Sequence, residues 1–108
     1  MIIYPNQRVI TIKENATTEN NAIILDCETT MKAMRDLKPT TFMVWIYLNA
    51  NENGCEFALS RVDVMNQTGI GSSSYDRAIK DLKEKGYLIH TTDNCYDFYA
   101  APAGGNEL

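Results

Sequence analysis

Serine hydroxyls and basic side chains gather in one short stretch of this sequence. Arg77 and Lys80 stand three residues apart, so they are neighbours on one face of a predicted helix. Hydroxyl, guanidinium and ammonium groups bind phosphate oxygens and base edges, so we interpret the stretch as a surface for contact with double-stranded DNA. The candidate DNA-contacting residues are Arg61, Ser72, Ser73, Ser74, Arg77 and Lys80.

A second interpretation treats the same residues as an ordinary solvated helix face. Asp76 with Lys80, or Asp81 with Lys85, would then form ion pairs four residues apart. We favour DNA contact because the serines cluster where the helix would enter a groove. The two aspartates oppose this interpretation, since a carboxylate repels phosphate unless it accepts a hydrogen bond from a cytosine amino group.

Residues suited to catalysis or metal binding are sparse. His90 and Cys95 could face each other across a hairpin as a nucleophile pair, but no orienting third group accompanies them, so we expect no enzyme. Cys27, Cys55 and Cys95 are odd in number and widely spaced, which predicts reduced thiols. No histidine or carboxylate completes a metal site with them, and we expect no metal and no cofactor.

Two short helices around a tight turn must position the candidate surface. Ser60 is expected to cap the first helix, and Gly69 to end it with a positive φ that lets Ile70 fold back into the core. The second helix is predicted from Ser72 to Lys85, with an apolar face spaced i, i+3, i+4 and i+7. The predicted core contains Trp45, Ile46, Val62, Met65, Ile70, Tyr75, Ala78, Ile79, Leu82 and Leu88.

A hairpin is expected to follow the second helix. Gly86 is placed to end the helix, Tyr87 to Thr91 favours a strand, and Cys95 to Tyr99 would return from a turn at residues 92–94. The hairpin carries Asp93 and Asp97 without a basic residue, so we do not expect it to enter a DNA groove. Its aromatic residues are interpreted as core cover.

The order of these elements resembles that of bacterial and phage winged helix-turn-helix proteins, and most closely small phage or plasmid replication-initiator and replisome-organiser domains. The resemblance implies an α+β fold with three to four helices and a small antiparallel sheet that includes the wing. It also implies that serines and arginine of the second helix face DNA. The matching residues are Leu37 to Thr40, Phe42 to Leu48, Gly69-Ile70, Ser73 to Leu82 and Lys85 to Ile89.

The segments before the motif are predicted as an arm and a scaffold. Residues 2–13 read as a strand, residues 14–21 as a loop, and Ala22 to Asp26 as the partner strand of an N-terminal hairpin arm. A helix over residues 28–37 and a second one from Pro39 would follow, then a strand over Cys55 to Leu59 that pairs with the wing. Trp45 and the five methionines are interpreted as core fillers. The expected division is an arm over 1–27, a domain over 28–99 and a flexible tail over 100–108.

Charge and composition limit the function further. The net charge of −4 weakens a simple DNA-binding hypothesis, but residues 60–91 hold five basic against four acidic side chains and form the least acidic part. No membrane span or targeting segment is seen, so we expect a cytoplasmic protein. The function predicted is a phage- or plasmid-type DNA-binding regulator or replication-initiation module, with a homodimer as an open alternative. The rival hypothesis is an acidic interaction module that binds and inhibits a host protein or nucleic-acid machine.

Overall fold

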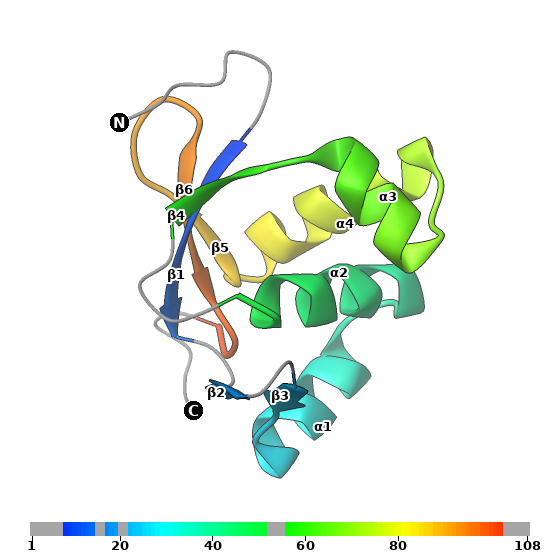
Figure 1. Cartoon of the computed structure of the whole chain (residues 1–108), viewed down its shortest axis with the longest axis vertical. Coiled ribbons are helices and arrows are strands. Elements are labelled where there is room, and N and C mark those ends of the chain that lie inside the picture. The colour runs from blue at the N-terminus through cyan, green and yellow to red at the C-terminus, as the bar shows by residue number, and fades with distance from the viewer. Residues whose placement is uncertain (1–7, 15–16, 20–21, 52–55, 103–108) are drawn as a thin grey trace.

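Among the described residues, four α-helices lie to one side of a four-stranded mixed sheet, and a separate two-stranded hairpin lies beside the helices (Figure 1). The computed structural model describes residues 8–14, 17–19, 22–51 and 56–102. The expectation of an α+β chain with three to four helices is confirmed. The elements in chain order are β1 (Arg8–Glu14), β2 (Thr17–Glu19), β3 (Ala22–Ile24), α1 (Cys27–Asp36), α2 (Pro39–Asn49), β4 (Glu56–Leu59), α3 (Arg61–Thr68), α4 (Ser72–Glu84), β5 (Leu88–His90) and β6 (Cys95–Tyr99).

Strand β1 occupies an inner position in the sheet, whose order is β4-β1-β6-β5. It runs antiparallel to β4, with Ile10 opposite Phe57, and parallel to β6, with Ile10 opposite Tyr96. Three expectations are therefore wrong: the sheet is not wholly antiparallel, β1 does not pair with β3, and β4 does not pair with the β5–β6 hairpin. The physical reason is that β1, whose Val9 and Ile10 are buried, finds main-chain hydrogen-bonding partners on both of its edges by lying between β4 and β6. Cys55 and residues 1–7 lie outside the described residues.

Strand β3 pairs instead with β2, which falls in the run expected to be a loop. The two strands form a short antiparallel hairpin, with Thr18 opposite Ile23. Its threonines favour a strand on β-branching alone, and the surrounding polar residues masked that signal.

Helices α1 and α2 are separated at Lys38-Pro39 as predicted, but Asp26, which was predicted as a strand residue, is instead the N-cap of α1. The Asp26 carboxylate accepts hydrogen bonds from the Thr29 N–H at 2.9 Å and from the Thr29 hydroxyl at 2.8 Å. Leu37 is extended before Pro39, which opens α2 at its first turn. At the far end of the sheet, Ala100 is buried and its carbonyl accepts from Trp45 Nε1 at 2.9 Å.

The turn between α3 and α4 is built as predicted. The Ser60 hydroxyl accepts from the Asp63 N–H at 3.1 Å, and Gly69 ends α3 with φ 82°. Ile70 is 8% exposed and belongs to the core. Gly86, with φ 88°, follows α4 and leads into β5. Gly69 and Ile70 thus set the path of the chain from α3 into α4, and Gly86 sets its path from α4 into β5.

The buried face of α4 carries the predicted core, but several apolar residues are misplaced by the sequence prediction. Val62 is 65% exposed because the N-terminal turn of α3 presents its opposite face, at Val64, to the core. Met31, Met34 and Met43 are exposed as well, so the core-filler interpretation is wrong for them. Met65 is only half-buried and lies outside the main cluster. The buried cluster comprises Ile10, Ala33, Leu37, Val44, Trp45, Leu48, Leu59, Val64, Ile70, Tyr75, Ala78, Ile79, Leu82, Tyr87, Leu88, Phe98 and Ala100.

Within the described part of the chain, the apolar stretches of the helices all fall short of the length that a bilayer crossing requires.

Candidate functional site

The outward face of α4 presents the hydroxyl and basic groups that the sequence predicted. Its opposite face is buried through Tyr75, Ala78, Ile79 and Leu82, which fixes the helix against α2 and α3. Gly71 precedes α4 in an extended conformation, and no described side chain caps this N-terminus. The first backbone N–H groups of α4 therefore lie beside the exposed Ser72 and Ser73, where an anion would find donors and the positive end of the helix dipole.

The exposed Arg61 side chain makes its contacts with residues of the same chain. Its guanidinium lies 2.7 Å from Asp76 Oδ1 and donates to Ser72 Oγ at 2.8 Å. It also lies 5.0 Å above the Tyr75 ring, within reach of a cation–π contact. Arg61 thus joins the start of α3 to the start of α4 and neutralises Asp76. The structure brings it together with Ser72, one of the three predicted serines, as a residue that holds Ser72 in place.

Arg77 and Lys80 remain on the outward face. Arg77 is exposed, and in the part of the chain that the structure describes its guanidinium has no partner. Lys80 pairs loosely with Glu84, at 4.0 Å, with both side chains more than three-fifths exposed. The expected Asp76–Lys80 pair is absent among the described residues, because Asp76 pairs with Arg61. An exposed pair at 4.0 Å contributes little, so Lys80 remains available to a ligand.

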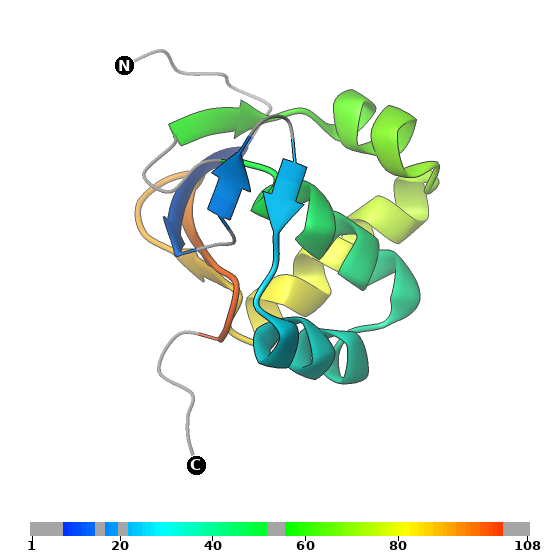
Figure 2. The same cartoon turned by 60° about the horizontal axis from the view of Figure 1, so that its bottom comes forward.

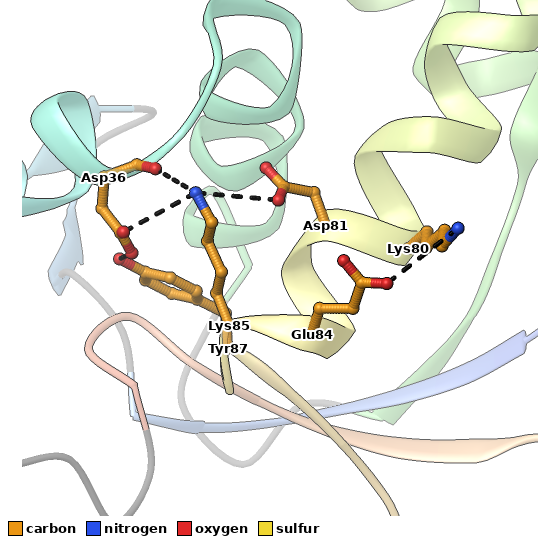
Figure 3. Close-up of polar contacts among 6 residues, drawn as sticks. All are labelled: Asp36, Lys80, Asp81, Glu84, Lys85 and Tyr87. Carbon is orange, nitrogen blue, oxygen red and sulfur yellow. Dashed lines mark hydrogen bonds and ion pairs between the residues drawn. The ribbon is translucent and has the colours of Figure 1, made fainter.

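Asp81 is turned away from this face toward the end of α1 (Figure 3). Its Oδ1 lies 3.7 Å from Lys85 Nζ, and its side chain is only 14% exposed, so one of the two ion pairs named under the solvated-face interpretation is present. Lys85 also lies 3.7 Å from Asp36 Oδ1 and donates to the Asp36 carbonyl. The Tyr87 hydroxyl donates to Asp36 Oδ2 at 2.9 Å. Burial, and then this hydrogen bond, raises the pKa of Tyr87.

These pairs decide the charge of the outward face of α4. Asp76 and Asp81 were the two residues that opposed DNA contact, and both are neutralised by a neighbouring cation. Arg77 and Lys83 carry charges that no described carboxylate pairs, although Lys83 lies 5.5 Å above the Tyr96 ring. Once Lys80 is set against Glu84, the charges of this face that remain unpaired among the described residues are those of Arg77 and Lys83. The sequence did not single out Lys83, and its i, i+3 spacing from Lys80 is the signal that could have done so.

The β5–β6 hairpin does not assemble a cysteine–histidine pair. His90 lies opposite Tyr96 in the register, and the two ring centroids are 5.2 Å apart. His90 Nε2 lies 2.6 Å from the Asp93 carbonyl oxygen, within the turn. Cys95 stands one position earlier on β6 and is half-buried. Among the described residues, no group of three or more metal-binding side chains comes together.

A groove between β3, α2 and α3 is the feature that the sequence did not reveal. Its volume is about 400 Å³, and its walls combine the exposed apolar residues Ile23 and Met43 with the Tyr47–Asp63 pair. The Tyr47 hydroxyl donates to Asp63 Oδ2, and burial together with this bond raises the pKa of Tyr47. The residues lining the groove are Ile23, Met43, Ile46, Tyr47, Ala50, Asn51, Asp63, Gln67 and Thr68.

Comparison with known proteins gives no match to a protein-family model, to a curated protein or to a solved structure. Proposals about function therefore stand on the geometry and charge of the chain itself.

Proposed function

We propose that this chain is a cytoplasmic DNA-binding protein of the winged-helix type, acting as a phage or plasmid regulator or replication-initiation module. Helix α4 would lie in the major groove with its outward face toward the bases. The order α2, β4, α3, α4, β5 and β6 supports this proposal, as does the burial of the opposite face of α4. The insertion of β1 between β4 and β6 departs from the small antiparallel sheet that the resemblance implies, and it does not involve α3, α4 or the turn between them.

The observation that carries the proposal is the removal of negative charge from the outward face of α4. Arg61 neutralises Asp76 at 2.7 Å, and Lys85 holds Asp81 toward α1. Phosphate attraction depends on the charges that face the DNA and falls off within a Debye length, so a net charge of −4 over the whole chain matters less than this local surplus.

Each residue of the surface would have a distinct role. Ser72 and Ser73, with the adjacent backbone N–H groups, would bind a phosphate at the start of α4. Arg77 and Lys80 would reach base edges or phosphates farther along the groove. Arg61 would hold Ser72 in position through its hydrogen bond and is not assigned a direct contact.

Fluorescence anisotropy with a random-sequence duplex at several salt concentrations tests this proposal. Arg77→Ala should weaken binding and, if Arg77 contacts a phosphate, reduce the slope of log affinity against log salt by about one unit. Lys32→Ala removes an exposed basic side chain from α1, outside the candidate surface, and should leave the slope unchanged. A folded protein that does not bind the duplex at low salt would refute the proposal.

The groove beside Asp63 favours a second candidate function, an interaction module that docks on and inhibits a host protein. The apolar walls of the groove would receive apolar side chains of the partner. The β5–β6 hairpin, which carries Asp93 and Asp97, would attract basic ones. In that case, replacing Asp93 and Asp97 by asparagine would slow association with the partner, whereas Arg77→Ala would change it little. Opposite responses to these substitutions would separate the two functions.

A further inference from the structure

The outer face of α1 carries an apolar stripe that no described element covers. Met31 and Met34 are 45% and 50% exposed, and Cys27, also exposed, lies one turn before Met31. The three stand at i, i+4 and i+7, which places them along one line of the helix. Ala33 and Leu37 face the core from the neighbouring side of the helix, so the stripe lies beside the buried face of α1.

A further apolar side chain lies close by in the chain. Ile24, on β3, is 54% exposed. Strand β3 leads directly into α1, and both lie on the near side of the molecule in Figure 2. Clustered exposed apolar residues mark an interaction surface more often than single ones do.

Charges border the stripe in an ordered way. Glu28 and Arg35 stand seven residues apart and so lie on the same flank of the stripe, the acid near the N-terminus of α1 and the base in its last turn. Glu28 has only a loose contact with Lys32, at 3.9 Å between two highly exposed side chains. Arg35 is exposed and has no partner among the residues that the structure describes.

We propose that this stripe binds a second copy of the chain, with the two α1 helices antiparallel about a two-fold axis. In a two-fold antiparallel pair the same flank of each helix meets itself, running in the opposite direction. Glu28 therefore faces Arg35 of the partner subunit, and the contact occurs twice. Met31 meets Met34 of the partner subunit near the axis, where flexible thioethers adapt to each other. A parallel two-fold pair would place the two charged flanks on opposite sides of the contact and form no Glu28–Arg35 pair, so the charge pattern favours the antiparallel one.

The contact should be weak. Ten residues of helix extend about 15 Å, and two such helices with Ile24 at their edge bury less than a standard stable interface. A concentration-dependent equilibrium between monomer and dimer follows. This inference is independent of DNA binding, because it uses residues of α1 and β3 that are outside the candidate DNA surface.

Sedimentation equilibrium over a range from micromolar to millimolar protein tests the proposal. The native chain should pass from monomer to dimer as its concentration rises. The double variant Met31→Gln/Met34→Gln should remain monomeric, and its thermal unfolding midpoint should equal that of the native chain. Val62→Gln is the matched control, because Val62 is equally apolar and 65% exposed but lies on α3. A native chain that stays monomeric throughout, or a Val62 variant that loses the dimer as the methionine variant does, overturns the proposal.

A charge exchange tests the antiparallel arrangement itself. Glu28→Arg and Arg35→Glu each replace two attractive contacts by two repulsive ones, so each should raise the dissociation constant of the dimer by about tenfold. The double variant Glu28→Arg/Arg35→Glu restores opposite charges across the axis and should recover most of the native affinity. A double variant that dimerises no better than the single variants contradicts the arrangement.

Discussion

Single side chains decide whether α4 presents a basic or a mixed face. Asp81 lies four residues before Lys85, and this pairing could be predicted from spacing alone. The direction in which the pair points could not be predicted from spacing. It depends on Asp36 at the end of α1, which accepts hydrogen bonds from Lys85 and from the Tyr87 hydroxyl (Figure 3). Likewise, the partner of Asp76 is Arg61 across the turn and not Lys80 on its own helix. Contacts between elements therefore override the nearest pairing in sequence.

Replacing Lys85 tests how much its ion pair with Asp81 contributes to the free energy of unfolding. Lys85→Ala would leave the largely buried Asp81 carboxylate without its cation, and Oδ2 of that carboxylate already has no partner among the described atoms. We expect a loss of about 1 to 2 kcal/mol in the free energy of unfolding measured with urea, because Lys85 itself is one-third exposed. Lys80→Ala, whose pair with Glu84 is fully solvated, should cost less than about 0.5 kcal/mol. Equal losses would contradict the assignment.

At the scale of elements, local signals set the helices and the turn that orient the candidate surface. The Ser60 cap, Gly69 with its positive φ and the apolar face of α4 are all read from neighbouring residues, and all three are confirmed. Val62 was misjudged because apolar residues at positions 62, 64 and 65 are compatible with two faces of a short helix, and packing chose Val64. The groove at Tyr47 and Asp63 was missed because its walls come from three separate elements.

Gly69 supplies the prediction for the turn. A Cβ added at Gly69 would meet no atom within 4 Å, so the cost of Gly69→Ala comes from the left-handed backbone alone. We expect a loss of about 1 kcal/mol in the free energy of unfolding. Gly71 has equally open surroundings but an ordinary φ of −85°, so Gly71→Ala should cost less, namely only what alanine loses against glycine at an N-cap. Denaturant titrations of both variants make the comparison, and a Gly71 variant as unstable as the Gly69 variant would contradict it.

At the scale of the whole molecule, β1 closes the sheet by lying between β4 and β6. The sequence predicted a strand there but not its partners, because alternating apolar residues show that a strand buries one face and say nothing about which distant strands flank it. Strand pairing across some fifty to ninety residues is fixed by the complete core, to which β1 contributes Ile10.

Native-state hydrogen exchange tests this placement. The amides of Ile10 and Thr11 should exchange only on global unfolding, as slowly as those of the buried part of α4, because β1 has a strand on each side. The amides of β2 and β3, held in a separate two-stranded hairpin, should exchange faster. Fast exchange at Ile10 would mean that β1 is a detachable arm.

Amide chemical-shift mapping can show whether the outward face of α4 contacts DNA, as we propose. On titration with a short duplex at low salt, we expect the largest changes from Ser72 to Lys80, with smaller ones at Arg61 and none at β3 or the Asp93 turn. Those unaffected sites serve as controls within the same spectra. Changes concentrated around the groove of Ile23, Met43 and Asp63, or no changes with the protein folded, would contradict the account.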